Sequence, residues 1–161
     1  ALAQAIGRMM VLAPRPPVAV TLAERHDPDA YYRTRKGLYV WEEFRDRVVA
    51  KAKPVEAGTA FTVNGADLGR DAADEEVAAA LPSSHLFDET TLCAVLTVLI
   101  AEQPDGQSGE LENTGRANLL YTPSCVVGVG WRAGRRRWSV DAWRRGGRRW
   151  SAGSRVFSPA N

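Results

Sequence analysis

The stretch "VVGVGWRAGRRRWSVDAWRR", residues 126–145, decides the fold that this sequence predicts. Apolar residues alternate with glycine or polar residues on both sides of Gly134, a pattern typical of two β-strands joined by a tight turn. A turn at 133–134 or at 134–135 gives the same faces, because both registers set odd-numbered residues of the first strand beside even-numbered residues of the second. We therefore expect an antiparallel hairpin whose faces can be assigned residue by residue.

One face of this hairpin is apolar and needs a cover. It carries Val127, Val129, Trp131, Trp138, Val140 and Ala142. The segment "FDETTLCAVLTVLIAEQP", residues 87–104, supplies the cover, because its apolar residues recur at the i, i+3, i+4, i+7 spacing of a helix. Asp88 is suited to cap the start of that helix. We expect a helix over 89–102 at the centre of the core.

The opposite face of the hairpin is basic and aromatic, and its two glycines, Gly128 and Gly130, leave a shallow trough. A two-glycine turn at 146–147 predicts a third strand that adds Arg148 and Trp150 to this face. The candidate binding residues are Ser139, Asp141, Arg132, Arg137, Arg145, Arg148, Trp143 and Trp150.

Two interpretations of this face stay open. Indole rings stack on bases and forked guanidinium groups bind phosphate or carboxylate, so the face suits a nucleic acid or an acidic peptide. In the other interpretation Trp143 and Trp150 form a cross-strand pair covered by arginine stems, which is an ordinary structural role. Asp141 is alone among arginines, and we expect its pKa to be depressed, which suits an ion pair better than a general base.

The rest of the chain predicts the elements that pack on this sheet. Helical spacing at 2–12 stops at Pro14, and a short strand follows at 18–22. The polar segment 26–37 predicts a loop, with one helical turn after Asp29 as the alternative. Residues 38–54 predict an amphipathic helix with Trp41, Phe44 and Val48 on one face. A strand at 59–63 should end in a turn at Asn64-Gly65, and a helix should run from a cap at Asp71 to Pro82.

The order of these elements favours an α+β fold in which helices of the first two thirds pack on a mostly antiparallel sheet formed by a C-terminal β-meander. We expect one domain over residues 1–161. It comprises a helical and acidic part up to about 104, an exposed loop at 104–116, and an Arg/Trp-rich meander at 117–161.

Composition adds limits on the class of protein. The 161 residues are 45% hydrophobic and 25% charged, the profile of a globular chain, and no apolar run is long enough to span a membrane. Cys93 and Cys125 fall on apolar segments, so we expect two buried thiols and a reducing, cytoplasmic location.

Charge is segregated along the chain. The net charge is +4 over residues 1–55, −10 over 56–125 and +8 over 126–161. Such segregation marks a nucleic-acid face in some proteins, and in others it marks two surfaces that complement each other within one fold.

Catalytic patterns are weak. Cys93 with His85 would suggest a thiol and its base, but Cys93 lies in the apolar helix, which favours a structural thiol. His26 with Asp27 and Asp29 offers metal ligands, but Pro28 makes this segment a turn. We therefore assign no catalytic residue, metal or cofactor.

We expect a small non-catalytic interaction protein that uses the Trp/Arg-rich sheet face. Its partner would be another protein or a second copy of this chain. A nucleic-acid-binding protein is the first alternative, and a small enzyme that uses Asp141 in the glycine trough is the second.

Overall fold

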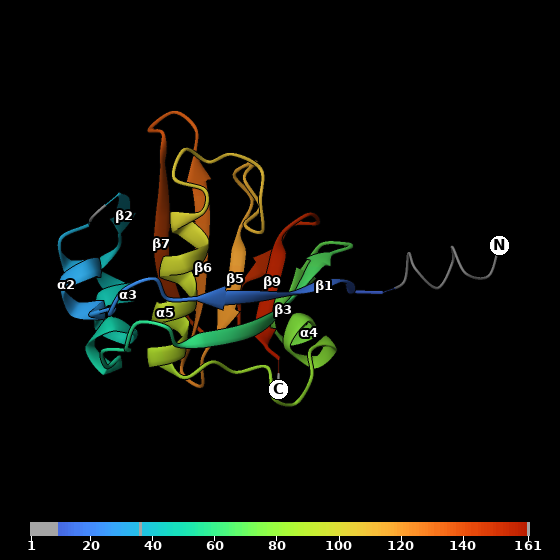
Figure 1. The fold of residues 1–161 in the computed structure, drawn as a ribbon. Helices are drawn as coiled ribbons and strands as arrows, with labels where there is room; N and C mark the ends of the chain where they lie inside the picture. Colours follow the sequence, from blue (N-terminus) through green and yellow to red (C-terminus); the bar gives the residue numbers. More distant parts are fainter. Residues whose placement is uncertain (1–9, 36, 161) are drawn as a thin grey trace.

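A computed structural model describes residues 10–35 and 37–160, and its fold is α+β (Figure 1). Seven strands form one sheet in the order β1-β3-β9-β5-β6-β7-β2. In chain order they are β1 (Leu12–Thr21), β2 (Leu38–Val40), β3 (Ala60–Leu68), β5 (Asn118–Tyr121), β6 (Cys125–Arg132), β7 (Arg137–Arg144) and β9 (Arg155–Pro159). A separate two-stranded sheet pairs β4 (Ala72–Ala73) with β8 (Arg149–Trp150).

The helices precede the last four strands of the main sheet, as the sequence predicts. They are α2 (Pro28–Arg33), α3 (Glu42–Arg47), the 3-10 turn η1 (Val49–Lys51), α4 (Asp74–Ala80) and α5 (Glu89–Ala101). Most strand pairs are antiparallel, but β2 pairs with β7 and β9 pairs with β5 in parallel. Within the described residues no helix is long and apolar enough to cross a membrane.

The predicted hairpin is confirmed in β6 and β7. Trp131 lies opposite Trp138 and Arg132 opposite Arg137, so the turn spans 133–136 and the faces are those expected from either shorter turn. Consecutive main-chain hydrogen bonds close this turn, and Arg136 adopts a left-handed conformation with φ of 51°.

Helix α5 fills the concave face of the main sheet. Asp88 caps it by accepting a hydrogen bond from the Thr91 amide at 2.7 Å, and seven of its residues are buried. In Figure 1, α5 lies in front of β6 and β7, whereas β1 and β3 run steeply across these strands. Val20 of β1 and Val63 of β3 join α5 and the apolar hairpin face in one core cluster. The sheet therefore coils around the helix.

A second, smaller core lies on the other face of the sheet. It joins Leu119 and Tyr121 of β5 to Val77 of α4 and Trp150 of β8. This core covers β5 and the neighbouring end of β6.

Several predictions for the first half of the chain are wrong in detail. Residues 1–9 of the predicted helix lie outside the described part, and residues 10–12 are not helical because β1 begins at Leu12. The predicted helix at 38–54 is divided into β2, α3 and η1, because the β2 edge pairs with β7 and Trp41 then turns out to solvent.

Two further corrections concern local turn signals. Asn64-Gly65 is no turn, since β3 runs through it with β1 on one side and β9 on the other. Helix α4 begins at Asp74 rather than after Asp71, because residues 72–73 first pair with β8. In both places tertiary strand pairing overrides a local propensity.

The predicted meander is shifted by one strand. Its three strands are β5, β6 and β7, whereas β8 pairs with β4 instead of β7. Arg148 is therefore not a cross-strand neighbour of Arg145. Strand β9 inserts between β3 and β5 and ties the end of the chain into the middle of the sheet.

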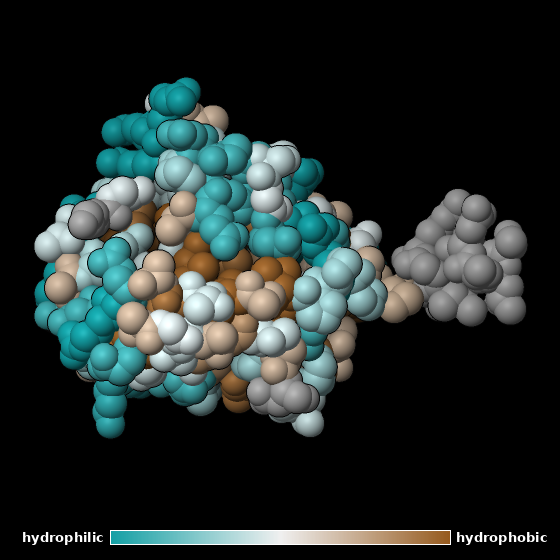
Figure 2. All heavy atoms as spheres, in the orientation of Figure 1, coloured by the Kyte–Doolittle hydropathy of each residue, from teal (hydrophilic) through white to brown (hydrophobic). Residues whose placement is uncertain are grey.

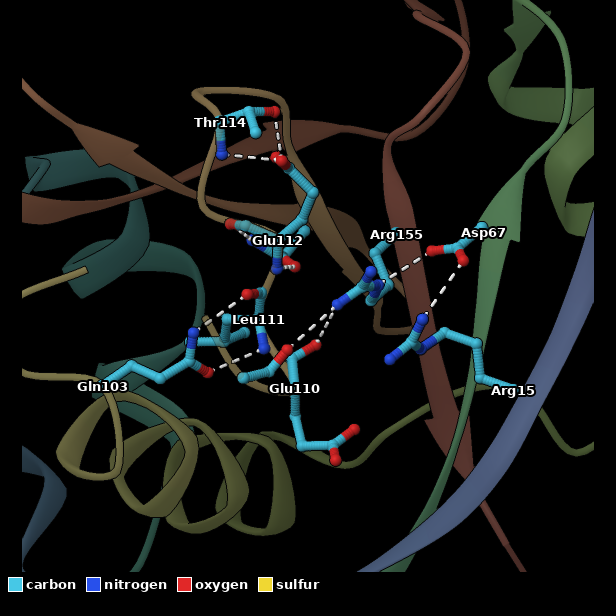
Figure 3. Close-up of polar contacts among 10 residues, drawn as sticks. Arg15, Asp67, Gln103, Glu110, Leu111, Glu112, Thr114 and Arg155 are labelled. Atoms are coloured by element: carbon cyan, nitrogen blue, oxygen red, sulfur yellow. Dashed lines mark hydrogen bonds and ion pairs between the residues drawn. The ribbon is translucent and has the colours of Figure 1, made fainter. Parts of the chain in front are cut away.

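The loop at 104–116 contains no helix or strand, as predicted, but it is anchored on both sides (Figure 3). The Gln103 side chain donates to the Leu111 carbonyl at 3.0 Å and accepts from the Leu111 amide at 2.8 Å. Arg155 donates to the Glu110 carbonyl at 2.8 Å and pairs with Asp67, which also binds Arg15. Buried Leu111 thus fixes the loop over the end of α5.

Leu96→Ala should lower the free energy of unfolding by roughly 2 to 5 kcal/mol, because Leu96 is fully buried in α5 and its loss leaves a cavity. Urea denaturation measures this change. Val98→Ala, at a half-buried position of the same helix, is the control and should cost clearly less. Equal losses for the two variants would contradict the placement of the core.

His26 makes stability depend on pH. Burial lowers the pKa of this histidine below 6.5, and Asp27 opposes that shift. The unfolded chain therefore binds the proton more tightly, and stability should fall as the pH drops from about 6.5 through the lower folded-state pKa. Chemical denaturation across this pH range should show that the free energy of unfolding falls less in His26→Gln than in the parent protein. His85→Gln is the matched control, and its free energy of unfolding should fall as much as that of the parent protein.

Candidate functional site

The predicted site residues of β6 and β7 share the outer face of the sheet. Ser139 lies opposite Gly130 and Asp141 opposite Gly128, and Tyr39 of β2 lies on the other side of Ser139. We call this surface the outer face. It comprises Tyr39, Trp41, Arg132, Arg137, Ser139, Asp141, Trp143 and Arg148.

Trp143 fills much of the expected glycine trough. A Cβ atom on Gly128 would lie only 2.5 Å from the Trp143 ring, so the indole lies directly over the Gly128 backbone. The Trp143 and Trp150 ring centroids are 5.6 Å apart although the two strands are not paired. Trp150 is buried, and the Arg148 guanidinium covers Trp143 at 4.3 Å from the ring centroid.

Two of the three arginines of the outer face, Arg137 and Arg148, lie on aromatic rings. The Arg137 guanidinium lies 4.8 Å from the Tyr39 ring centroid, and Arg35 approaches the same ring at 5.4 Å. Arg145 is directed away from this group, toward the Tyr121 ring of the second core, at 5.9 Å. Arg132 instead donates from Nε to the Ser139 hydroxyl at 2.9 Å.

None of the ion pairs between described residues involves an arginine of residues 131–150. Arg137, Arg145 and Arg148 lie near aromatic rings. None of the arginines in this stretch has a carboxylate within ion-pairing distance among the described residues. The outer face is therefore a surface of positive charge that the fold itself does not neutralise.

Asp141 is half-buried in the middle of this surface, and the expectation of a depressed pKa is wrong. Burial raises the pKa of Asp141, the hydrogen bond from the Ala142 amide lowers it, Glu43 of α3 raises it and Arg148 lowers it. Burial prevails because no arginine comes within ion-pairing distance of the carboxylate among the described residues.

Tyr39 and Trp41 were missed as site residues, because the segment 38–54 was expected to form one helix. Trp41 has 44% of its surface exposed and packs edge to face on Tyr39 at 5.2 Å between centroids. The sequence signal that could have found them is the alternation in residues 38–40. Leu38 and Val40 are buried, and Tyr39 lies between them on the opposite face of the strand.

Two acidic residues of the middle segment bind groups of the basic C-terminal part of the chain. Buried Asp74 accepts hydrogen bonds from the Tyr121 hydroxyl and the Trp150 indole, both at 2.7 Å, and from the Gly146 amide at 3.1 Å. Glu75 accepts from the Gly147 amide at 3.2 Å. The acidic start of α4 thus holds the turn between β7 and β8 through main-chain and indole N–H groups.

The cysteines and histidines form no catalytic arrangement that the structure supports. Cys93 and Cys125 are free and buried, and burial strongly raises the pKa of the Cys93 thiol. His85 Nδ1 lies 2.7 Å from the Pro82 carbonyl oxygen, which can only accept a hydrogen bond. Over residues 10–35 and 37–160, no group of three or more His, Cys, Asp or Glu side chains is placed to hold a metal ion.

Comparisons of the chain with protein-family models, with curated proteins and with solved structures find no match. The geometry of the chain itself therefore carries the functional argument.

Asp141→Asn should be at least as stable as the parent protein at neutral pH. A carboxyl whose pKa is raised by folding is destabilising when ionised, and its contribution improves as the pH falls through the folded-state pKa toward 3.8. The amide keeps the acceptor for Ala142. Urea denaturation at neutral and acid pH should show a difference that closes on acidification.

The control for this experiment is Asp105→Asn in the exposed loop, which removes the same charge at an unburied position. A marked loss of stability in Asp141→Asn alone would mean that Asp141 forms a stabilising ion pair in solution.

Proposed function

We propose that the chain is a non-catalytic binding protein whose outer face docks on an acidic surface of a separate protein. The observation that carries this proposal is that Arg137 and Arg148 lie on aromatic rings and Arg132 is held by Ser139. None of the three is ion-paired among the described residues. A guanidinium held in this way is positioned before binding, so less side-chain entropy is lost when a carboxylate arrives.

The composition of the outer face supports a protein partner. Interface hot spots are enriched in tryptophan, tyrosine and arginine, and these are the residue types that Tyr39, Trp41 and Arg137 bring together. Trp41 is one of two large apolar side chains, with Met10, that are prominently exposed among the described residues. Its partly covered position beside Tyr39 makes it a suitable anchor at the centre of an interface.

The same geometry argues against stacking of nucleic-acid bases. Trp150 is buried and Trp143 is already covered by Arg148, so neither presents a free ring to a base. Asp141 and Glu43 also place negative charge within the arginine group. A continuous phosphate backbone would meet both carboxylates, whereas a protein surface can set a donor group against them.

A photo-cross-linking amino acid at position 41 tests the proposal in the organism that produces the protein. We expect adducts with one discrete protein, and mass spectrometry should place the cross-linked site in an acidic segment of that protein. Arg137→Glu should abolish the adduct, because it removes a cation and adds repulsion. The same cross-linker at position 10, an equally exposed apolar site, is the matched control and should give no such adduct.

Three results would count against the proposal. Nuclease-sensitive adducts would assign the face to a nucleic acid, and an adduct of twice the chain's mass would assign it to a second copy. Equal labelling from positions 41 and 10 would mean that the outer face does not bind a partner more than another exposed apolar site does.

A further inference from the structure

A cleft of about 490 Å³ opens at the end of the outer face, between the loop at 104–116 and the turn of the β6–β7 hairpin. Asn113, Thr114 and Gly115 line one side, and residues 131–135 line the other. The cleft is shallow and open to solvent, and its volume lies within the range of ordinary ligand pockets. Figure 1 shows the hairpin turn and this loop next to each other at the top of the molecule, and Figure 2 shows that this end is hydrophilic.

The Trp131 side of the cleft is rigid. Trp131 is packed edge to face on Trp138 at 5.3 Å between centroids, and the Trp138 indole donates to the Gln103 carbonyl at 2.6 Å. On its other side, Trp131 lies against Gly106, where a Cβ atom would come within 2.1 Å of the ring. No side chain larger than that of glycine fits at position 106 without moving this indole.

The loop side of the cleft is also held in place. Asn113 donates from its side-chain amide to the Gly106 carbonyl at 2.9 Å. Glu112 accepts hydrogen bonds from the Thr114 amide and the Thr114 hydroxyl, and Figure 3 shows these contacts. Asn118 of β5 binds both the amide and the carbonyl of Glu112. The cleft is therefore formed before any ligand binds.

Its charged groups are two arginines. The hydrogen bond from Arg132 Nε to the Ser139 hydroxyl holds the Arg132 guanidinium over the Gly130 backbone. A Cβ atom added to Gly130 would lie 3.7 Å from a terminal nitrogen of Arg132. Arg135 is exposed on the turn, and neither arginine has an ion-pair partner among the described residues. The carboxylate of Glu112 does not line the cleft. Its Oε1 accepts the hydrogen bonds from Thr114, and its buried Oε2 has no hydrogen-bond partner among the described residues.

We propose that this cleft receives an aspartate or glutamate side chain of the acidic partner, with Arg132 and Arg135 as its paired cations and Trp131 as its apolar wall. The inference rests on the proposed function, since Arg132 belongs to both the outer face and the cleft. Arginine forks match the two oxygens of a carboxylate, and such charge-assisted bonds are shorter and stronger than neutral ones. A cleft at one end of the outer face fixes the position of the partner along that face, which arginines lying on aromatic rings do not do by themselves.

The test is a fluorescence-anisotropy titration of a labelled Glu/Asp-rich peptide with the full chain at physiological salt. We expect Arg135→Ala to weaken binding by about tenfold, the effect of losing one charge-assisted hydrogen bond. Arg136→Ala is the matched control, because Arg136 is the next residue of the same exposed turn and does not line the cleft. It should change the affinity by less than about twofold, the effect of a screened surface charge.

A second measurement locates the peptide independently of affinity. In amide and indole NMR spectra, with the Trp131 signal assigned through Trp131→Phe, the peptide should shift the Trp131 indole and the Asn113 side-chain amide. Binding without these shifts would overturn the inference.

The outcomes separate this inference from the proposed function. Peptide binding that Arg137→Ala weakens but Arg135→Ala does not would overturn the cleft and leave the outer face in place. Equal weakening by Arg135→Ala and Arg136→Ala would reduce the cleft to unspecific attraction. If a single-stranded oligonucleotide binds more tightly than the peptide, and Arg135→Ala weakens its binding too, the cleft binds phosphate. That result would overturn the proposal that it binds a carboxylate.

Discussion

The structure depends on the burial of α5 on almost every side. Leu92, Leu96 and Leu99 define one apolar face, but Cys93 and Ala94 are buried as well, so a flat sheet against one face would leave apolar surface in water. The coiled sheet places β6 and β7 behind the helix and β1 and β3 across it. Tyr32 of α2 covers the helix near Cys93, where its hydroxyl donates to the Cys93 carbonyl. Because the hairpin uses its apolar face for α5, its basic and aromatic face is necessarily directed outward.

The arginines of the outer face have a structural role, but they have no ion-pair partner among the described residues. Arg148 and Arg137 cover the rings of Trp143 and Tyr39, so their guanidinium groups protect aromatic surface that would otherwise face water. Neither guanidinium has an ion-pair partner among the described residues, and we propose that their N–H groups bind an anion of the partner. The structural and functional interpretations of the Arg/Trp-rich stretch are thus compatible, since an arginine can cover a ring and still lack an ion-pair partner.

The acidic residues of the chain do not cancel this charge, because the best placed of them bind other donors. Asp74 is occupied by Tyr121, Trp150 and the Gly146 amide, and Glu75 by the Gly147 amide. These bonds fasten the turn after β7 without engaging Arg145 or Arg148. The fold therefore uses part of its negative charge to position a loop that bears arginines, and the arginines stay unpaired.

The sequence by itself determined the α+β class, the helix over α5 with its cap at Asp88, and both faces of the β6–β7 hairpin. These features follow from local periodicity, which alternation or helical spacing encodes within a short segment. Tertiary structure alone decided which strands pair: β8 with β4, β9 between β3 and β5, and β2 beside β7. Strand pairing joins residues far apart in the chain, so the outer-face position of Tyr39 and Trp41, the raised pKa of Asp141 and the cleft beside Trp131 could not be read from neighbouring residues.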